Sequence, residues 1–203
     1  MRREWTEISL NDIVVKPRIR ENDGDLSSLT ESIRKIGLLC PIVVDRDNVL
    51  IAGGGKPAGV IREADQAWAL GDEVAHWLCI DLLAASARLL AAILRDARLE
   101  RDWERLLHRV AEREVGPPIV FCPVRFLQQR EARFPPHPLP HGWSVTSDSI
   151  AARIAGILDA EELVLLKSAD PPPQLQPPYV DEYFVQAAAG LTCVRSINLR
   201  RYA

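Results

Sequence analysis

The sequence has no long apolar run, no excess of basic residues and no closely spaced cysteines. No segment approaches the roughly 20 apolar residues that cross a bilayer, and the first ten residues lack the apolar core of a signal peptide. The net charge is −3, whereas nucleic-acid-binding domains are usually basic. We therefore expect a cytoplasmic protein without a membrane partner, and nucleic acid is not the partner that this composition favours.

The cysteines and histidines also argue against a metal site. Cys40, Cys79, Cys122 and Cys193 are far apart and lie in apolar runs, which favours buried free thiols. His137 and His141 are four residues apart, but no further Cys or His is near them in sequence. We therefore predict no metal ligands on the protein.

What is present indicates a folded α/β domain. Hydrophobic residues make up 47% of the 203 residues, which is enough for a sizeable core. Apolar segments typical of strands alternate with segments of helical periodicity, and this alternation predicts a mainly parallel sheet flanked by helices. The strands are expected at residues 8–15, 41–45, 49–52, 118–122, 163–166 and 193–199. The helices are expected at residues 25–37, 58–70, 72–95, within 99–114, from 146 to 158 and within 179–189.

Two packing expectations follow from helical spacing. In the helix at residues 72–95, one buried face is expected to carry Ala75, Leu78, Leu82, Leu89 and Ile93. Core packing is the expected role of Trp68, Trp77 and Trp103.

The stretch from residue 141 to 173 is the one around which the rest of the chain is organised. Thr146, Ser147, Asp148 and Ser149 form a polar cluster at the start of the predicted helix. Thr146 or Ser147 can cap this helix with a side-chain oxygen, and Asp148 suits the positive end of its dipole.

The strand that follows this helix ends in a second polar cluster. Residues 163–166 form an apolar run of the kind buried in parallel sheets, and Lys167, Ser168 and Asp170 come directly after it. Ligands of open α/β sheets bind beyond the carboxyl ends of strands. Two polar clusters, at a helix start and at a strand end, suit a phosphorylated ligand.

A glycine loop occupies the end of another predicted strand. Gly53, Gly54 and Gly55 follow residues 49–52 and precede a helix, so the backbone there can approach a ligand closely. We expect this loop to face the cluster Thr146–Ser149 across one cleft, because both lie at strand-to-helix junctions. A plain turn is the alternative interpretation of the glycines.

Three ordered motifs resemble the amino acid kinase family, which includes aspartate, acetylglutamate and uridylate kinases. They are IAGGG with the following IREAD helix, WSVTSDSIAARIA and LVLLKSADPPP, and the resemblance spans about residues 51–200. It implies a kinase that uses ATP and Mg²⁺ to phosphorylate a small molecule. It also implies that Asp148 organises catalytic lysines and that the segment from Lys167 to Asp170 opens the nucleotide site.

The resemblance also implies roles for individual residues. It implies that Asp148, Lys167 and Lys56 are catalytic. Nucleotide and substrate binding fall on Gly53, Gly54, Gly55, Thr146, Ser147, Ser149, Ser168 and Asp170. The residues themselves leave simpler interpretations open, because Asp148 can be a helix-start carboxylate and Lys167 a solvated lysine at a strand end.

The front of the chain departs from that family. Its members begin with a strand that ends in Lys-Gly-Gly, whereas Pro17 and Arg18 follow Lys16 here. Residues 7–54 instead resemble the amino-terminal half of a ParB/sulfiredoxin-like domain. The segments that carry this resemblance are EISLNDIVV, GLLCPIVV and LIAGG. We therefore divide the chain into a ParB-like unit at residues 1–54 and a kinase-like α/β domain at residues 55–203.

The sequence thus supports an ATP-dependent small-molecule kinase with low or absent activity, since the Lys-Gly-Gly donors are missing. Two alternatives stay open: a nucleotide- or metabolite-binding protein without turnover, and a ParB-like nucleotide- or DNA-binding regulator. The substrate is not defined by the sequence, and a homo-oligomer is neither required nor excluded.

Overall fold

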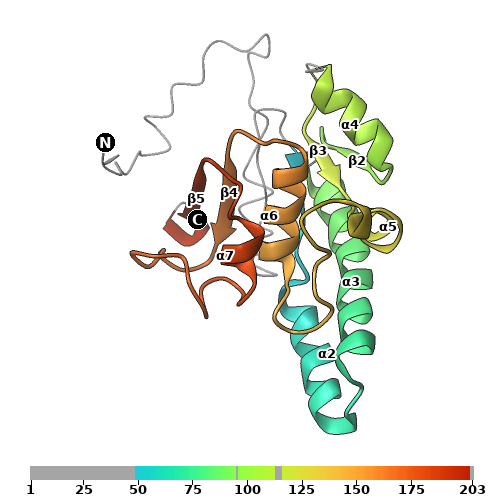
Figure 1. The fold of residues 1–203 in the computed structure, drawn as a ribbon, viewed down its shortest axis with the longest axis vertical. Coiled ribbons are helices and arrows are strands. Elements are labelled where there is room, and N and C mark those ends of the chain that lie inside the picture. The colour runs from blue at the N-terminus through green and yellow to red at the C-terminus, as the bar shows by residue number, and fades with distance from the viewer. Residues whose placement is uncertain (1–48, 95, 113–115, 202–203) are drawn as a thin grey trace.

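The structure is a computed structural model that describes residues 49–94, 96–112 and 116–201 (Figure 1). The strands expected at residues 8–15 and 41–45 and the helix expected at residues 25–37 lie outside the described residues. Most of the predicted ParB-like unit at residues 1–54 lies outside them as well, so the division at residue 54 stays a prediction.

Two parallel sheets carry the described fold, which confirms the predicted α/β class with parallel strands flanked by helices. The first sheet has the order β1-β3-β2, formed by Val49–Leu50, Ile119–Phe121 and Arg98–Glu100. In this sheet, β3 pairs in parallel with both neighbours. The second sheet pairs β4 (Leu163–Lys167) with β5 (Val194–Asn198), also in parallel.

Helices connect these strands. The chain leaves β1 through the glycine loop into α2 (Gly55–Trp68) and α3 (Asp72–Ile93), which pack against each other. Helices α4 (Trp103–Ala111), α5 (Val124–Gln129) and α6 (Ser147–Ile157) follow β2 and β3. The short elements are η2 (Glu131–Arg133), α7 (Phe184–Ala187) and η3 (Leu199–Arg201).

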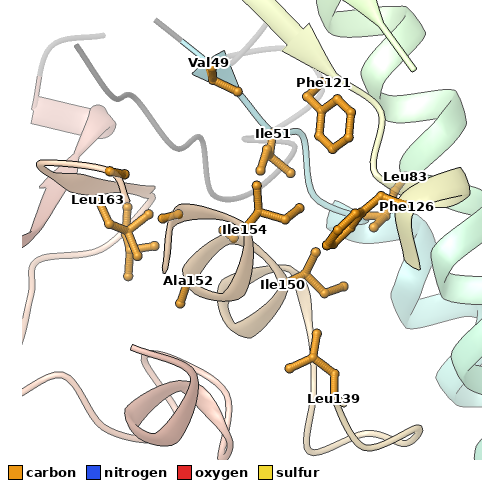
Figure 2. Packing of buried hydrophobic residues seen from close by; sticks show 14 of the residues in the cluster. Val49, Ile51, Leu83, Phe121, Phe126, Leu139, Ile150, Ala152, Ile154 and Leu163 are labelled. Atoms are coloured by element: carbon orange, nitrogen blue, oxygen red, sulfur yellow. The ribbon is translucent and has the colours of Figure 1, made fainter. Parts of the chain in front are cut away.

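Helix α6 lies at the centre of the molecule, between the β4-β5 sheet and α3 (Figure 1). All its residues from Asp148 to Ala155 are buried. Figure 2 shows Ile150 and Ile154 on the side that faces Ile51 and Phe126, while Leu163 of β4 packs on another side. Burial on both sides explains why this segment is nearly free of exposed polar residues.

The strands of the first sheet alternate their side chains between two apolar layers. Ile51 and Phe121 belong to the main core with α6, whereas Leu50 and Val120 pack with Ala87 and Leu90 of α3. The carboxyl ends of β1, β3 and β2 therefore meet at one edge of a sheet that is covered on both faces.

Several local predictions are corrected by the structure. Helix α2 begins at Gly55 rather than near residue 58. Pro57 is tolerated in the first turn, because the backbone N–H that proline lacks has no partner within the helix there. Trp68 is 75% exposed, although core packing was expected, whereas Trp103 is buried among Phe121, Phe126 and Phe134. Within residues 179–189 only α7 is helical.

The buried face of α3 also differs from the predicted one. Leu78 and Leu89 are exposed. The buried residues are Ala75, His76, Ile80, Leu83, Ser86, Ala87 and Leu90. Helix α3 is apolar on more than one side, so periodicity alone did not define the packed face. Helix α3 is long and apolar enough to cross a membrane by length and composition alone. These two criteria are weak evidence, because the core helix of a soluble protein also meets them.

Candidate functional site

A cavity of about 200 Å³ lies where the glycine loop, α2, α3 and the start of α6 meet. Its apolar wall includes Ala58, Ile80, Leu83, Val145 and Ile150. Its other lining residues are Gly54, Gly55, Arg62, Ala75, His76, Cys79, Gly142, Trp143, Thr146 and Ser147. An apolar concavity with a few convergent polar groups is the usual form of a small-molecule site. We call it the glycine-loop pocket.

The glycine loop forms one edge of this pocket. Buried Ile51 and Ala52 fix the end of β1, and the chain then turns into α2. Gly55 has φ 57°, a left-handed conformation that costs a side-chain-bearing residue about 1–2 kcal/mol. A Cβ on Gly54 would lie 3.2 Å from the Cβ of Ala58. The glycines thus permit a tight turn that places backbone at the pocket.

The start of α6 forms the opposite edge, and Thr146 and Ser147 line the pocket there. The expectation that the glycine loop faces this cluster across one cleft is confirmed for Gly54, Gly55, Thr146 and Ser147. The predicted capping is different. Thr146 is the N-cap residue, but its hydroxyl does not accept a hydrogen bond from the helix.

Asp181 supplies the cap of α6 from a distant part of the sequence. Its Oδ2 accepts the backbone N–H of Thr146 at 2.9 Å, the N–H of Ser149 at 3.0 Å and the Thr146 hydroxyl at 2.7 Å. Ser149, which is fully buried, donates its hydroxyl to Asp181 Oδ1. Two backbone donors at the helix start are therefore already satisfied by a protein carboxylate.

Asp148 and Lys167 form a buried ion pair beside this helix start. Lys167 Nζ at the end of β4 donates to Asp148 Oδ2 at 2.6 Å, and both side chains are largely buried. Burial raises the pKa of Asp148, and the charge of Lys167 partly offsets this rise. Oδ1 of Asp148 is buried and has no hydrogen-bond partner among the described residues.

The end of β4 continues into a polar surface shared with β5. The Tyr179 ring lies 5.4 Å from Lys167 Nζ, and its hydroxyl contacts Ser196. Asp170 Oδ1 accepts Asn198 Nδ2 and Arg201 Nε, each at 2.7 Å. The hydrogen bond from Arg201 lowers the pKa of exposed Asp170.

A second set of polar residues borders the pocket on the side of α2 and α3. The Arg62 guanidinium lies 4.6 Å from the centre of the Trp143 ring, and Trp143 Nε1 donates to Asp65 at 2.7 Å. His76 Nδ1 accepts the N–H of Gly142 at 3.4 Å. Burial lowers the pKa of His76, and the charge of His141, which stacks on it, adds to this effect.

The sequence-predicted residues are thus distributed over two neighbouring places. Gly54, Gly55, Thr146 and Ser147 line the pocket, while Asp148 and Lys167 pair next to it. Gly53 is buried within the loop, Ser149 is held by Asp181, and Ser168 and exposed Asp170 lie past β4. The side chain of Lys56 lies outside what the structure describes. Their roles in binding or catalysis stay predictions.

Sequence reasoning missed three residues of this region. Asp181 follows a proline-rich stretch and carries no local capping pattern, so only the fold brings it to α6. Arg62 has no signal beyond its place two turns into α2. Trp143 precedes the polar cluster, and an indole stacked under a guanidinium cannot be read from spacing.

Fold and pocket together define an α/β protein with a cavity at the carboxyl end of a parallel strand. No family model matches the chain. Over 122 residues it is 25% identical to [5-(aminomethyl)furan-3-yl]methyl phosphate kinase of Methanocaldococcus jannaschii. The matched part is 60% of this chain and 52% of that kinase. The chain therefore spans about half the length of this relative and is a distant homologue of a small-molecule kinase.

Proposed function

We propose that the protein is an ATP-dependent phosphotransferase whose small acceptor binds in the glycine-loop pocket. The main observation behind this proposal is that one cavity is lined by Gly54, Gly55, Thr146 and Ser147. The Asp148–Lys167 pair lies beside that cavity. Phosphoryl transfer needs positioning and charge stabilisation rather than covalent chemistry by the protein. The distant homology to a small-molecule kinase supports the same reaction class.

The residues beside the pocket suit the charges of this reaction. ATP supplies the phosphoryl group, and Mg²⁺ offsets the charge of its phosphates. Lys167 provides a cation that Asp148 holds in place. The unpartnered Oδ1 of Asp148 is a carboxylate oxygen that fits Mg²⁺, which usually takes one or two protein carboxylates together with phosphates. The described residues contain no group of three or more His, Cys, Asp and Glu that could hold a metal alone.

The pocket itself suggests the acceptor. A cavity of about 200 Å³ with an apolar wall fits a small, flat molecule, and Arg62 at its edge suits an acidic group. The relative's name gives its substrate as a furan that carries an aminomethyl group and a phosphate. We therefore propose a small acid or phosphomonoester with a compact apolar body as the acceptor.

We further propose that turnover is low. The donors that a first-strand Lys-Gly-Gly supplies in the amino acid kinases are absent from residues 1–52, where Pro17 and Arg18 follow Lys16. Loss of one well-placed donor costs about a hundred- to a thousand-fold in rate.

A nucleotide- or metabolite-binding protein without turnover is the second candidate. Asp181 already occupies the N–H groups of Thr146 and Ser149, and Asp148 already pairs Lys167. Donors that already bond within the protein cannot stabilise the charge that develops in a transition state. Such a site can therefore hold a ligand without accelerating a reaction.

Thermal unfolding with and without ligands tests the binding half of the proposal. ATP with Mg²⁺ at about 100 times its Kd should raise Tm by about 5–10 °C, because the ligand binds only the folded state. Lys167→Met should lose most of this shift, whereas Arg133→Met, which removes an exposed cation of η2, should keep it. Absence of a shift with ATP, GTP or CTP at millimolar concentration would contradict nucleotide binding.

A further inference from the structure

A second cavity, of about 320 Å³, lies beyond the carboxyl ends of β2 and β3. It is lined by Leu99, Glu100, Arg101, Asp102, Arg105 and Arg125. These residues come from the end of β2, the start of α4 and the first turn of α5. None of them lines the glycine-loop pocket. We call it the arginine cavity.

The two carboxylates of this cavity are engaged by the backbone. Asp102 is the N-cap of α4, and its Oδ1 accepts the N–H of Arg105 at 2.9 Å. Glu100 is buried, and its Oε1 accepts the N–H groups of Arg101 and Asp102, each at 2.9 Å. Both acids thus shape the turn from β2 into α4. The start of α4 is therefore already capped and is not itself the binding feature.

The three guanidinium groups, by contrast, have no carboxylate partner among the residues that the structure describes. Elsewhere in this part of the chain Arg130 pairs with Glu104, Arg153 with Glu131 and Arg195 with Glu162. The lining therefore holds three guanidinium groups and two carboxylates, which leaves one net positive charge, and a small anion bound between the guanidinium groups offsets it.

We propose that the arginine cavity binds a small phosphate-bearing anion. Guanidinium forks match the oxygens of phosphate in bidentate geometry, which an ammonium cannot do. The cavity has the size of a small-ligand site, and its place beyond parallel strand ends is the one that α/β sheets use for ligands. This inference does not depend on phosphotransfer at the glycine-loop pocket.

Isothermal titration calorimetry on the full chain tests the proposal with two probes, inorganic phosphate and glycerol 3-phosphate. At least one probe should bind. Tighter binding of inorganic phosphate would identify free phosphate as the preferred ligand, and tighter binding of glycerol 3-phosphate would identify a phosphomonoester. Arg105→Gln and Arg125→Gln should each raise Kd about tenfold or more. Arg88→Gln, which removes an exposed cation of α3, should leave Kd unchanged.

Arg62→Gln separates this cavity from the glycine-loop pocket, because it removes the cation of that pocket alone. Binding that survives Arg62→Gln and falls in the Arg105 and Arg125 variants would support the arginine cavity. Three results would overturn it: no heat from either probe at millimolar concentration, an equal loss in Arg88→Gln, or a loss confined to Arg62→Gln. Circular dichroism of each variant verifies that it is folded.

Discussion

Asp148 has surroundings that conflict with its charge. It is 4% exposed, only one of its oxygens is paired, and its partner Lys167 lies at the end of β4. Removing a carboxylate from water disfavours its ionised form, which is why its pKa rises despite the nearby ammonium. A carboxylate kept under such conditions is a functional-site candidate.

The raised pKa has a measurable consequence for stability. The folded protein binds a proton at Asp148 more tightly than the unfolded chain, whose carboxyl has a pKa near 3.8. The stability gained this way is fully present below that value and is lost as the pH rises through the raised folded pKa. The parent's free energy of unfolding, relative to that of Asp148→Asn, should therefore fall as the pH rises from about 4 toward neutral pH.

Urea denaturation of both proteins across this range measures the difference. Taking the difference cancels the other carboxyl groups, such as Glu162, whose pKa is lowered by its hydrogen bond from Arg195. Asp81→Asn, on the exposed side of α3, is the matched control for the loss of a carboxylate. A difference that instead rises toward neutral pH would mean that Lys167 outweighs burial.

At this scale the sequence predicted which residues gather, but not how they are held. The polar cluster Thr146–Ser149 and the strand-end Lys167 were recognisable from their junction positions, and they do lie close together. The cap from Asp181 was not predictable, because it joins residues 32 positions apart. Capping rules read only the neighbours of a helix start.

Helix α6 depends on a buried ion pair that joins it to the segment at residues 131–139. Arg153 Nε donates to Glu131 Oε1 at 2.8 Å, and its remaining nitrogens donate to the carbonyls of Phe134 and Pro135. Glu131 also accepts the N–H of Leu139. The guanidinium therefore fastens an irregular segment to the central helix.

Replacing Arg153 should be costly because it leaves the Glu131 carboxylate buried without its cation. We expect Arg153→Met to lower the free energy of unfolding by about 3–5 kcal/mol, measured by urea denaturation. Arg130→Met removes the same group from an exposed pair with Glu104 and should cost about 0–1 kcal/mol. Similar small losses in both variants would show that the buried pair contributes little.

Elements were predicted well where one periodicity dominates. The strands at residues 118–122, 163–166 and 193–199 appear as β3, β4 and β5 within one or two residues at each end. The buried face of α3 was misassigned because apolar residues surround much of that helix. Trp68 was misassigned because it ends α2, where helical spacing no longer indicates burial.

The whole molecule places two cavities at the carboxyl ends of the first sheet. The glycine-loop pocket follows β1, and the arginine cavity follows β2 and β3. The α/β class and the parallel pairing were predictable from the alternation of segments. The arginine cavity was not, because Arg125 follows β3, whereas Arg101 and Arg105 lie at the start of α4 after β2, and only the pairing of β2 with β3 brings them together.

The central claim is that the glycine-loop pocket and the Asp148–Lys167 pair form a phosphotransferase-type site. Transfer of the γ-phosphoryl group from labelled ATP to small acids, phosphomonoesters and nucleoside monophosphates tests it most directly. The assay uses the natural chain and a version whose residues 1–52 come from a relative with a Lys-Gly-Gly start. We predict weak or no transfer by the natural chain and clear transfer by the replaced version, reduced about a hundredfold or more by Asp148→Asn. Robust turnover by the natural chain would contradict the proposed loss of activity, and no transfer by a folded replaced version that binds ATP would contradict the site itself.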